Sequence, residues 1–210
     1  MKKLFVVCIF VVASGVCVYG QHALGSIEGS VRDLAGHPIR GATVYAYDSA
    51  KMVGRFVKVT TISDSTGRFV LANLPQGNYR VHAYKEEDGY ADTFFLFFKT
   101  NNNRAWKNVQ VQGSTPVRVA LQLGPKYATL RTSITDERGN PIGGGLTFWR
   151  PKDSDPQYGT GVNAESKLLV PPVSFRFEVS AQGYETWNSG FVTFKSGVTT
   201  EFVVRLRRSN

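Results

Sequence analysis

The chain has few of the residues that build redox, nucleophilic and metal sites. Its two cysteines, Cys8 and Cys17, both lie in the first twenty of 210 residues, so a chain that loses this segment can neither form a disulfide nor use a thiol. Its three histidines, His22, His37 and His82, stand in no H-x-x-E pair of the kind that holds catalytic zinc. No G-x-S-x-G nucleophile elbow occurs. These absences argue against an enzyme and against a metal or cofactor site.

Long apolar runs are absent except at the start of the chain. Two lysines there precede a nearly unbroken apolar stretch, 4–18, which is followed by small residues. This pattern is typical of a secretory signal peptide, and we expect residues 1–20 to be removed by cleavage after Gly20. The mature chain is then periplasmic, on the cell surface or extracellular. It meets a membrane only if the signal stays uncleaved.

Acidic residues are scarcer than basic ones. The 16 Asp and Glu stand against 25 Lys and Arg, which gives a formal net charge of +9, and loss of the two lysines near the start lowers it to +7. Because the basic residues are spread along the chain, we interpret the charge as solvated surface or as attraction to acidic polymers, and expect no nucleic-acid partner. The acidic groups at 86–88 and at Asp153 and Asp155 are interpreted as solvated turns rather than calcium ligands.

Apolar residues at helical spacing are missing as well. Short alternating stretches separated by turn signals take their place, and this pattern predicts an all-β chain. In the first half it predicts seven strands, at 26–32, 42–47, 55–62, 68–72, 78–84, 92–99 and 116–123. Seven short strands are typical of a β-sandwich.

One turn signal occurs twice. VRDLAGHPIRGATV begins at residue 31, and the similar ITDERGNPIGGGLT begins at residue 134. Asp can accept hydrogen bonds from amides ahead of it, Gly can adopt a positive φ and Pro fixes φ, so each string predicts a chain reversal after a first strand. We therefore predict two tandem seven-stranded sandwiches, at 21–124 and 125–210. The residues assigned to these turns are Asp33, Gly36, Pro38, Gly41, Asp136, Gly139 and Pro141.

The order of these signals resembles a known family. G-x-V-x-D-x-x-G-x-P-I-x-G-A-x-V, then DSTGRF, then L-P-x-G-x-Y-x-V is similar to the carboxypeptidase regulatory-like domain over nearly all of residues 25–123. The resemblance implies a transthyretin-like (prealbumin) Greek-key sandwich related to the B-type repeats of bacterial collagen adhesins. Over 127–207 the resemblance is partial, because DSTGRF has become NAESKL, so we expect a divergent second copy.

The resemblance also bears on activity. In that family the sandwich is an accessory to a zinc peptidase domain, and no such domain is recognisable here. Transthyretin-related hydrolases of the purine pathway share the architecture but end in Tyr-Arg-Gly-Ser, whereas this chain ends in RLRRSN. Some adhesin repeats form an isopeptide bond from a lysine on the first strand, where this chain has Arg32 and Arg131. We therefore expect a non-catalytic protein without that crosslink.

Aromatic residues near polar stretches are the remaining signal for a ligand. Their flat faces could stack on sugar rings while Arg150, Asp153 and an asparagine hydrogen-bond hydroxyl groups. The polar insertion 100–108 adds a tryptophan near its end. Packing in the core is the alternative interpretation for each ring, and the Phe-rich stretch 92–99 is interpreted as core on one side and interdomain or loop contact on the other. The candidate ligand-binding residues are Trp106, Trp149, Tyr158, Trp187 and Asn188.

Together these observations predict a secreted, non-catalytic binding module for carbohydrate or another cell-envelope polymer. The alternative is a structural or adhesin-like spacer, or a protein-interaction module, of the bacterial envelope, with all three tryptophans buried. A third interpretation is an appendage similar to the amino-terminal sandwich of TonB-dependent outer-membrane receptors. The expected partner is a polysaccharide or an envelope protein, and the sequence predicts neither the ligand nor the oligomeric state.

Overall fold

The computed structural model describes residues 24–48, 58–92 and 106–209. Its regular elements in these ranges are strands and one short 3-10 helix, η1 (Glu86–Asp88), which confirms the all-β prediction. The predicted signal peptide lies outside these ranges, and within them no helix is long and apolar enough to cross a bilayer. The first seven strands are β1 (Gly25–Arg32), β2 (Thr43–Asp48), β3 (Lys58–Ile62), β4 (Arg68–Leu74), β5 (Gly77–Tyr84), β6 (Trp106–Val111) and β7 (Val117–Gln122). The last seven are β8 (Ala128–Asp136), β9 (Gly144–Trp149), β10 (Tyr158–Val162), β11 (Glu165–Val170), β12 (Ser174–Ser180), β13 (Trp187–Thr193) and β14 (Thr199–Leu206).

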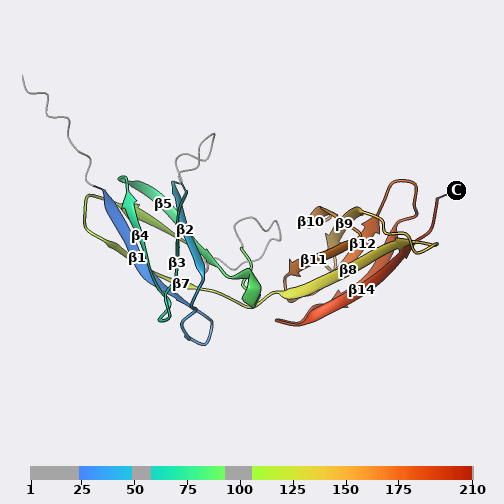
Figure 1. Ribbon diagram of the computed structural model, residues 1–210, viewed down its shortest axis with the longest axis horizontal. Coiled ribbons are helices and arrows are strands. Elements are labelled where there is room, and N and C mark those ends of the chain that lie inside the picture. Colours follow the sequence, from blue (N-terminus) through green and yellow to red (C-terminus); the bar gives the residue numbers. More distant parts are fainter. Residues whose placement is uncertain (1–23, 49–57, 93–105, 210) are drawn as a thin grey trace, which may run out of the picture.

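The strands form four sheets that pack as two sandwiches (Figure 1). The first sandwich pairs the sheet β4-β1-β7 with β3-β2-β5-β6, and the second pairs β11-β8-β14 with β10-β9-β12-β13. The connectivity is the same in both. The central strand of each three-stranded sheet, β1 or β8, is antiparallel to one neighbour and parallel to the last strand of its sandwich.

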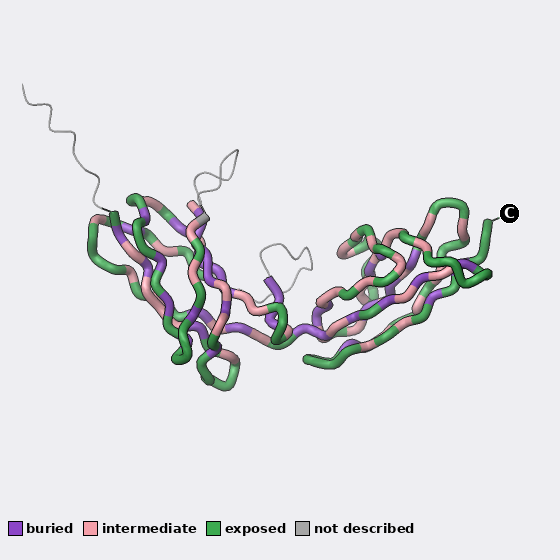
Figure 2. The backbone as a smooth tube through the Cα atoms, in the orientation of Figure 1, coloured by how far each residue is buried: buried purple, intermediate pink, exposed green. Residues whose placement is uncertain are grey.

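Each sandwich encloses its own apolar cluster, and buried residues recur along the strands of both (Figure 2). The cause is the period of two along the strands: in β8, Leu130 and Ile134 are fully buried while Arg131 between them is exposed. The first cluster contains Ile27 and Leu71, and neither has any exposed surface. Burying one such side chain stabilises a fold by about 1.5–3 kcal/mol. Apolar packing therefore stabilises each sandwich, and the described residues include no cysteine that could add a disulfide.

The repeated turn has the same geometry in both sandwiches. The carboxylate of Asp33 accepts hydrogen bonds of 2.9 Å from the amides two and four residues ahead, and that of Asp136 accepts the equivalent pair at 2.8 Å. Gly36 and Gly139 follow with φ of 87° and 85°, a region that side chains with a Cβ avoid. The aspartate therefore closes each reversal and the glycine permits it.

The prolines and glycines that follow return the chain to the sheet. Pro38 and Pro141 each form an isolated bridge with the end of the preceding strand. Gly41 has a φ of 73°, whereas Gly144, at the matching position, is required by space, because a Cβ there would lie 2.3 Å from the carbonyl oxygen of Ser180. One sequence position thus needs glycine in both copies of the turn, for two different reasons.

The edge strand beside β5 begins in a stretch that the sequence did not assign to a strand. The predicted strand 92–99 lies almost wholly outside the described residues. In the sheet, β5 lies between β2 and the edge strand β6, and β6 begins at Trp106, within the stretch that the sequence predicted as a polar insertion. Trp106 is therefore the first residue of a strand and not part of a loop.

A short linker joins the two sandwiches after β7. Its residue Tyr127 is buried and donates its amide hydrogen to the carbonyl of Gly89, which follows η1, at 2.8 Å. The ammonium of Lys126 lies 5.2 Å from the centre of the Tyr90 ring, and the Lys126 carbonyl accepts a 2.8 Å hydrogen bond from the hydroxyl of Ser196. The linker is thus bonded to the first sandwich on one side and to the second on the other.

Candidate functional site

Four of the five candidate ligand residues lie on one sheet of the second sandwich, β10-β9-β12-β13. The fifth, Trp106, belongs to β6 in the first sandwich, so the five do not form one site. Strand register shows which residues of the sheet share a face, because neighbours opposite each other across strands point the same way. The two faces of this sheet divide the four candidates.

Tyr158 and Trp187 point into the core. The Tyr158 ring stacks on that of Phe148 with centres 6.1 Å apart. The Trp187 ring lies 5.7 Å from Phe177 and 5.9 Å from Phe202. Both residues stand at the first position of a strand, and their rings pack against the aromatic core instead of forming an outward platform for a ligand.

Trp149 lies on the outer face, in a row that crosses three strands. Its register partner on β12 is Arg176, whose partner on β13 is Phe191. The guanidinium carbon of Arg176 is 4.6 Å from the centre of the indole ring, and 59% of Phe191 is exposed. We call Trp149, Arg176 and Phe191 the aromatic row. It presents a cation between two flat apolar rings on an open surface.

Polar groups beside the aromatic row fix the arginine. Glu178 Oε1 lies 3.7 Å from the Nη2 of Arg176 and accepts a 3.2 Å hydrogen bond from the side-chain amide of Asn188. Asn188 in turn accepts the amide hydrogen of Gly190 at 2.8 Å. The predicted ligand residue Asn188 is thus on the same face as Trp149, and its present role is to orient the carboxylate that pairs with the row.

A β-bulge in β13 makes this arrangement possible. Asn188 and Phe191 are three residues apart and would point to opposite faces of a regular strand. Opposite Phe177, however, β13 carries two residues, Ser189 and Gly190, and the register shifts there. Gly190 has a φ of 65°, and the hydroxyl of Ser189 accepts the Phe177 amide hydrogen at 2.9 Å. The extra residue turns both Asn188 and Phe191 outward.

The edge strand next to Trp149 leaves the same face bare. Gly159 and Gly161 on β10 lie opposite Thr147 and Gly145 of β9. A Cβ at Gly159 would have its nearest neighbour 3.8 Å away and one at Gly161 would have it 4.0 Å away. Neither glycine is required by packing or by a positive φ. Their effect is a flat strip of backbone that a large flat ligand can approach.

The loop 150–157 joins β9 to β10 beside the aromatic row. It borders a shallow hollow of about 260 Å³ lined by residues 152–157. Arg150 accepts the amide hydrogen of Asp153 through its carbonyl at 3.2 Å, and Lys152 has a φ of 75°. Among the described residues no group of three or more His, Cys, Asp or Glu could hold a metal ion. The polar side chains of residues 152–157 border the hollow.

The first sandwich contains a buried polar cluster that the sequence did not reveal. The Tyr45 hydroxyl donates to the carboxylate of Asp92 at 2.9 and 3.0 Å. The ring of His82 stacks on Tyr45 at 5.4 Å and on Tyr47 at 5.9 Å. Burial, helped by the positive charge of Arg80, lowers the pKa of His82 to about 3. His82 is therefore neutral at physiological pH and acts as one ring of a packed aromatic stack.

Burial also shifts the pKa of the Tyr45 hydroxyl in this cluster. Desolvation, and then the Asp92 carboxylate, raises the pKa of Tyr45 far above its ordinary value. Tyr45 thus remains a phenol that donates its hydrogen to Asp92. The neutral imidazole of His82 packs on Tyr45, and the Tyr45 hydroxyl is hydrogen-bonded to the Asp92 carboxylate. We interpret the cluster as a structural part of the sheet.

Comparison with known families finds a match for the first sandwich. Residues 26–124 match the family model of the carboxypeptidase regulatory-like domain. The match ends before β8, so it covers the first sandwich alone. None of the curated proteins matches the sequence.

Solved structures are similar to the chain at low identity. The Bacillus anthracis TIE protein is 15% identical with a TM-score of 0.37, over 89% of this chain and 34% of its own. A streptococcal ancillary pilin is 14% identical with a TM-score of 0.40, over 90% of this chain and 63% of its own. Klebsiella pneumoniae 5-hydroxyisourate hydrolase is 19% identical with a TM-score of 0.29, over 47% of this chain and 86% of its own. The chain spans less than two thirds of the first two proteins, and similarity at this level says nothing about its function.

Proposed function

We propose that this chain is an exported, non-catalytic protein that binds carbohydrate or another cell-envelope polymer. The observation that carries the proposal is the aromatic row on the outer face of the sheet β10-β9-β12-β13. The match of the first sandwich to a regulatory-like domain family supports a non-catalytic role. The apolar segment near the start of the sequence supports export. We further propose that the second sandwich is a divergent copy of the first, with the boundary near residue 124.

The chemistry of the row suits a sugar polymer. The guanidinium of Arg176 covers part of the indole of Trp149, so a sugar ring has the exposed ring of Phe191 and the remaining surface of Trp149 to pack against. Arg176 can pair with carboxylates of acidic sugars, since a guanidinium binds carboxylate in a fork. The positive formal net charge, +9 for the full sequence and +7 without the two lysines near its start, favours approach of such an anionic chain.

The test is binding of the purified chain to a panel of neutral and acidic glycans and envelope polysaccharides. Phe191→Ser removes an exposed ring, so we expect the fold to stay unchanged and the affinity to fall about tenfold, or about 1.4 kcal/mol. Trp149→Ala should weaken binding at least as much. Isothermal titration calorimetry in solution measures the affinity, and circular dichroism checks the fold.

Matched variants separate this site from a general loss of apolar surface. Ile62 on β3 is 57% exposed, close to the 59% of Phe191, and it belongs to the first sandwich. Ile62→Ser therefore removes a similar apolar area away from the aromatic row and should leave binding intact. Trp187→Phe keeps a ring in the core and should also leave it intact. Equal affinities for the wild type, Phe191→Ser and Trp149→Ala would show that the ligand binds elsewhere.

A second candidate function is a structural or adhesin-like spacer, or a protein-interaction module, of the envelope. The linker favours it, because hydrogen bonds from Tyr127 and Ser196 tie residues 126–127 to both sandwiches. Such a linker keeps a tandem array from bending freely. Failure to bind any member of the polymer panel would support this second function.

A further inference from the structure

The outward residues of the two three-stranded sheets occupy equivalent positions. We call the outward residues of β4-β1-β7 the β1 face and those of β11-β8-β14 the β8 face. Glu28 and Arg131 are equivalent, since each stands five residues before the aspartate of the repeated turn. Register then extends the match across each sheet, because both sheets have the same strand order and the same mixture of parallel and antiparallel pairs.

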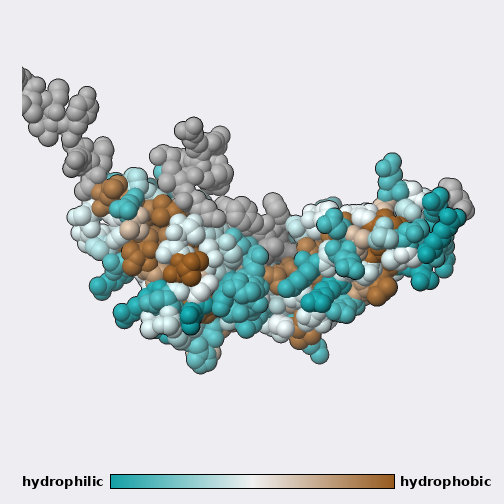
Figure 3. All heavy atoms as spheres, in the orientation of Figure 1, coloured by the Kyte–Doolittle hydropathy of each residue, from teal (hydrophilic) through white to brown (hydrophobic). Residues whose placement is uncertain are grey.

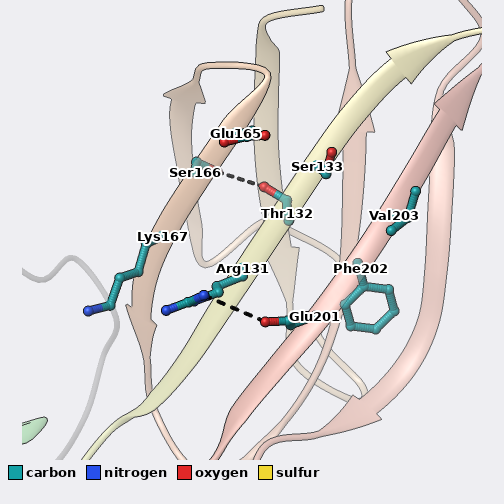
Figure 4. A pocket seen from close by; sticks show the side chains of 9 residues that line it. All are labelled: Arg131, Thr132, Ser133, Glu165, Ser166, Lys167, Glu201, Phe202 and Val203. Carbon is teal, nitrogen blue, oxygen red and sulfur yellow. Dashed lines mark hydrogen bonds and ion pairs between the residues drawn. The ribbon is translucent and has the colours of Figure 1, made fainter. Parts of the chain in front are cut away.

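The β8 face is an open, charged surface with a shallow groove of about 450 Å³ (Figure 4). Arg131 on the central strand lies between Lys167 of β11 and Glu201 of β14. Its Nη1 is 3.7 Å from the carboxylate of Glu201, and both side chains are more than half exposed. Val203 on the same face is 81% exposed. A pair this exposed contributes little to the stability of the sheet.

The β1 face carries the corresponding groove, of about 530 Å³. Glu28 on the central strand lies between Val70 of β4 and Arg118 of β7. Val70 is 51% exposed, and Figure 3 shows hydrophobic atoms over β1 and β4 beside hydrophilic ones. Apolar side chains left open beside charges are typical of surfaces that meet a partner.

Every charged position that the two grooves share has its sign reversed. Glu28 is matched by Arg131, and Arg118 by Glu201. On the edge strands, Arg68 beside Ser30 is matched by Glu165 beside Ser133. Where the β1 face has a negative charge the β8 face has a positive one, and the reverse also holds.

This reversal has a geometric consequence for stacked sheets. When two equivalent sheets stack about a two-fold axis that runs along a row of register partners, each position in that row meets its own equivalent. Identical faces would then bring like charges together. With the reversal, Glu28 meets Arg131 and Arg118 meets Glu201 in the same row, while Val70 meets the aliphatic stem of Lys167.

We propose that the β1 face of one copy of this chain docks on the β8 face of a second copy. The two faces belong to different sandwiches and do not meet within one chain (Figure 1). The contact therefore joins unlike surfaces of two molecules, and it builds either a reciprocal dimer or a chain of copies. The inference is independent of the proposed polymer site, which lies on the other sheet of the second sandwich.

Sedimentation velocity over a concentration series tests the proposal through charge exchange. One variant carries Arg131→Glu with Glu201→Arg, a second carries Glu28→Arg with Arg118→Glu, and a third carries all four changes. Each exchange keeps an opposite-charge pair within its own sheet, so the melting temperature should not change. We expect each two-residue variant to associate at least about tenfold more weakly than the wild type, because like charges then meet across the contact.

The variant with all four changes is the decisive sample. Its faces are complementary again, so we expect association to return to the wild-type level. Raising NaCl from about 0.15 M to about 1 M should weaken association of both the wild type and this variant. A wild-type chain that stays monomeric at concentrations near 1 mM, equal association of all variants, or no recovery in the four-residue variant would each overturn the proposal.

Discussion

At Gly36 the backbone conformation alone requires glycine. Its φ is 87°, and a Cβ built there would meet no atom within 4 Å. We therefore predict that Gly36→Val lowers the free energy of unfolding by about 1–3 kcal/mol through backbone strain without any steric clash. Urea denaturation followed by circular dichroism measures the change.

Asparagine provides the control for this position, since its short polar side chain tolerates the left-handed region better than other residues do. Gly36→Asn should therefore cost clearly less than Gly36→Val. Gly139, with a φ of 85° and no atom within 4 Å of a Cβ, should respond in the same way in the second sandwich. Equal stability of the valine and asparagine variants would contradict the assigned turn.

His82 makes stability depend on pH in a definite window. Its pKa is lowered from 6.5 to about 3 in the folded chain, first by burial. Below about pH 6.5 the unfolded chain binds a proton there that the folded chain does not, so the free energy of unfolding falls as pH falls toward 3. The slope approaches about 1.4 kcal/mol per pH unit. Urea denaturation between about pH 7 and about pH 5 measures it.

The variant His82→Phe keeps a ring beside those of Tyr45 and Tyr47 and removes the titrating group. We expect its stability to be nearly flat over this interval, whatever its absolute value. Asp33, Asp64 and Asp136 also have lowered pKa values, from an ordinary 3.8, so their contributions are lost only near and below pH 4. An unchanged slope in the variant would mean that another group titrates.

At the scale of the strand, alternation in the sequence was a good guide. The predicted strands 26–32, 68–72 and 78–84 correspond to β1, β4 and β5 within one or two residues. Each has a clear apolar period and a turn signal at its ends. Residues 100–108 misled the prediction, because their polar composition suggests a loop although β6 begins at Trp106. An edge strand needs few apolar residues, since one side of it has no neighbour to pack against.

The candidate site was only partly predictable for a similar reason. Alternation in SFRFEV already places Arg176 outward between two buried phenylalanines, and this signal was available in the sequence. The place of Phe191 was not, because the bulge at Ser189 and Gly190 changes which residues of β13 share a face. A Ser-Gly pair inside a strand hints at a bulge, but only the partner strand shows where the register shifts.

Over the whole molecule, two cores share one chain. The apolar clusters are separate, and among the described residues the linker contacts the sandwiches through a few hydrogen bonds and through Lys126, whose ammonium lies over the Tyr90 ring. Such bonds contribute about 0.5–1.5 kcal/mol each, which is small beside the loss caused by a cavity in either core. The sandwiches should therefore unfold as two units that are weakly coupled.

Leucine truncation in each core tests this independence. Leu71 and Leu130 are both fully buried, one in each cluster, and Leu→Ala at such sites costs about 2–5 kcal/mol. In calorimetry we expect Leu71→Ala to lower one transition by about 10 °C or more and Leu130→Ala to lower the other by a similar amount. Hydrogen exchange read by mass spectrometry assigns each transition to its sandwich. If either substitution moved both transitions equally, the linker would couple the sandwiches into one cooperative unit, and its few hydrogen bonds would have to transmit as much free energy as a core.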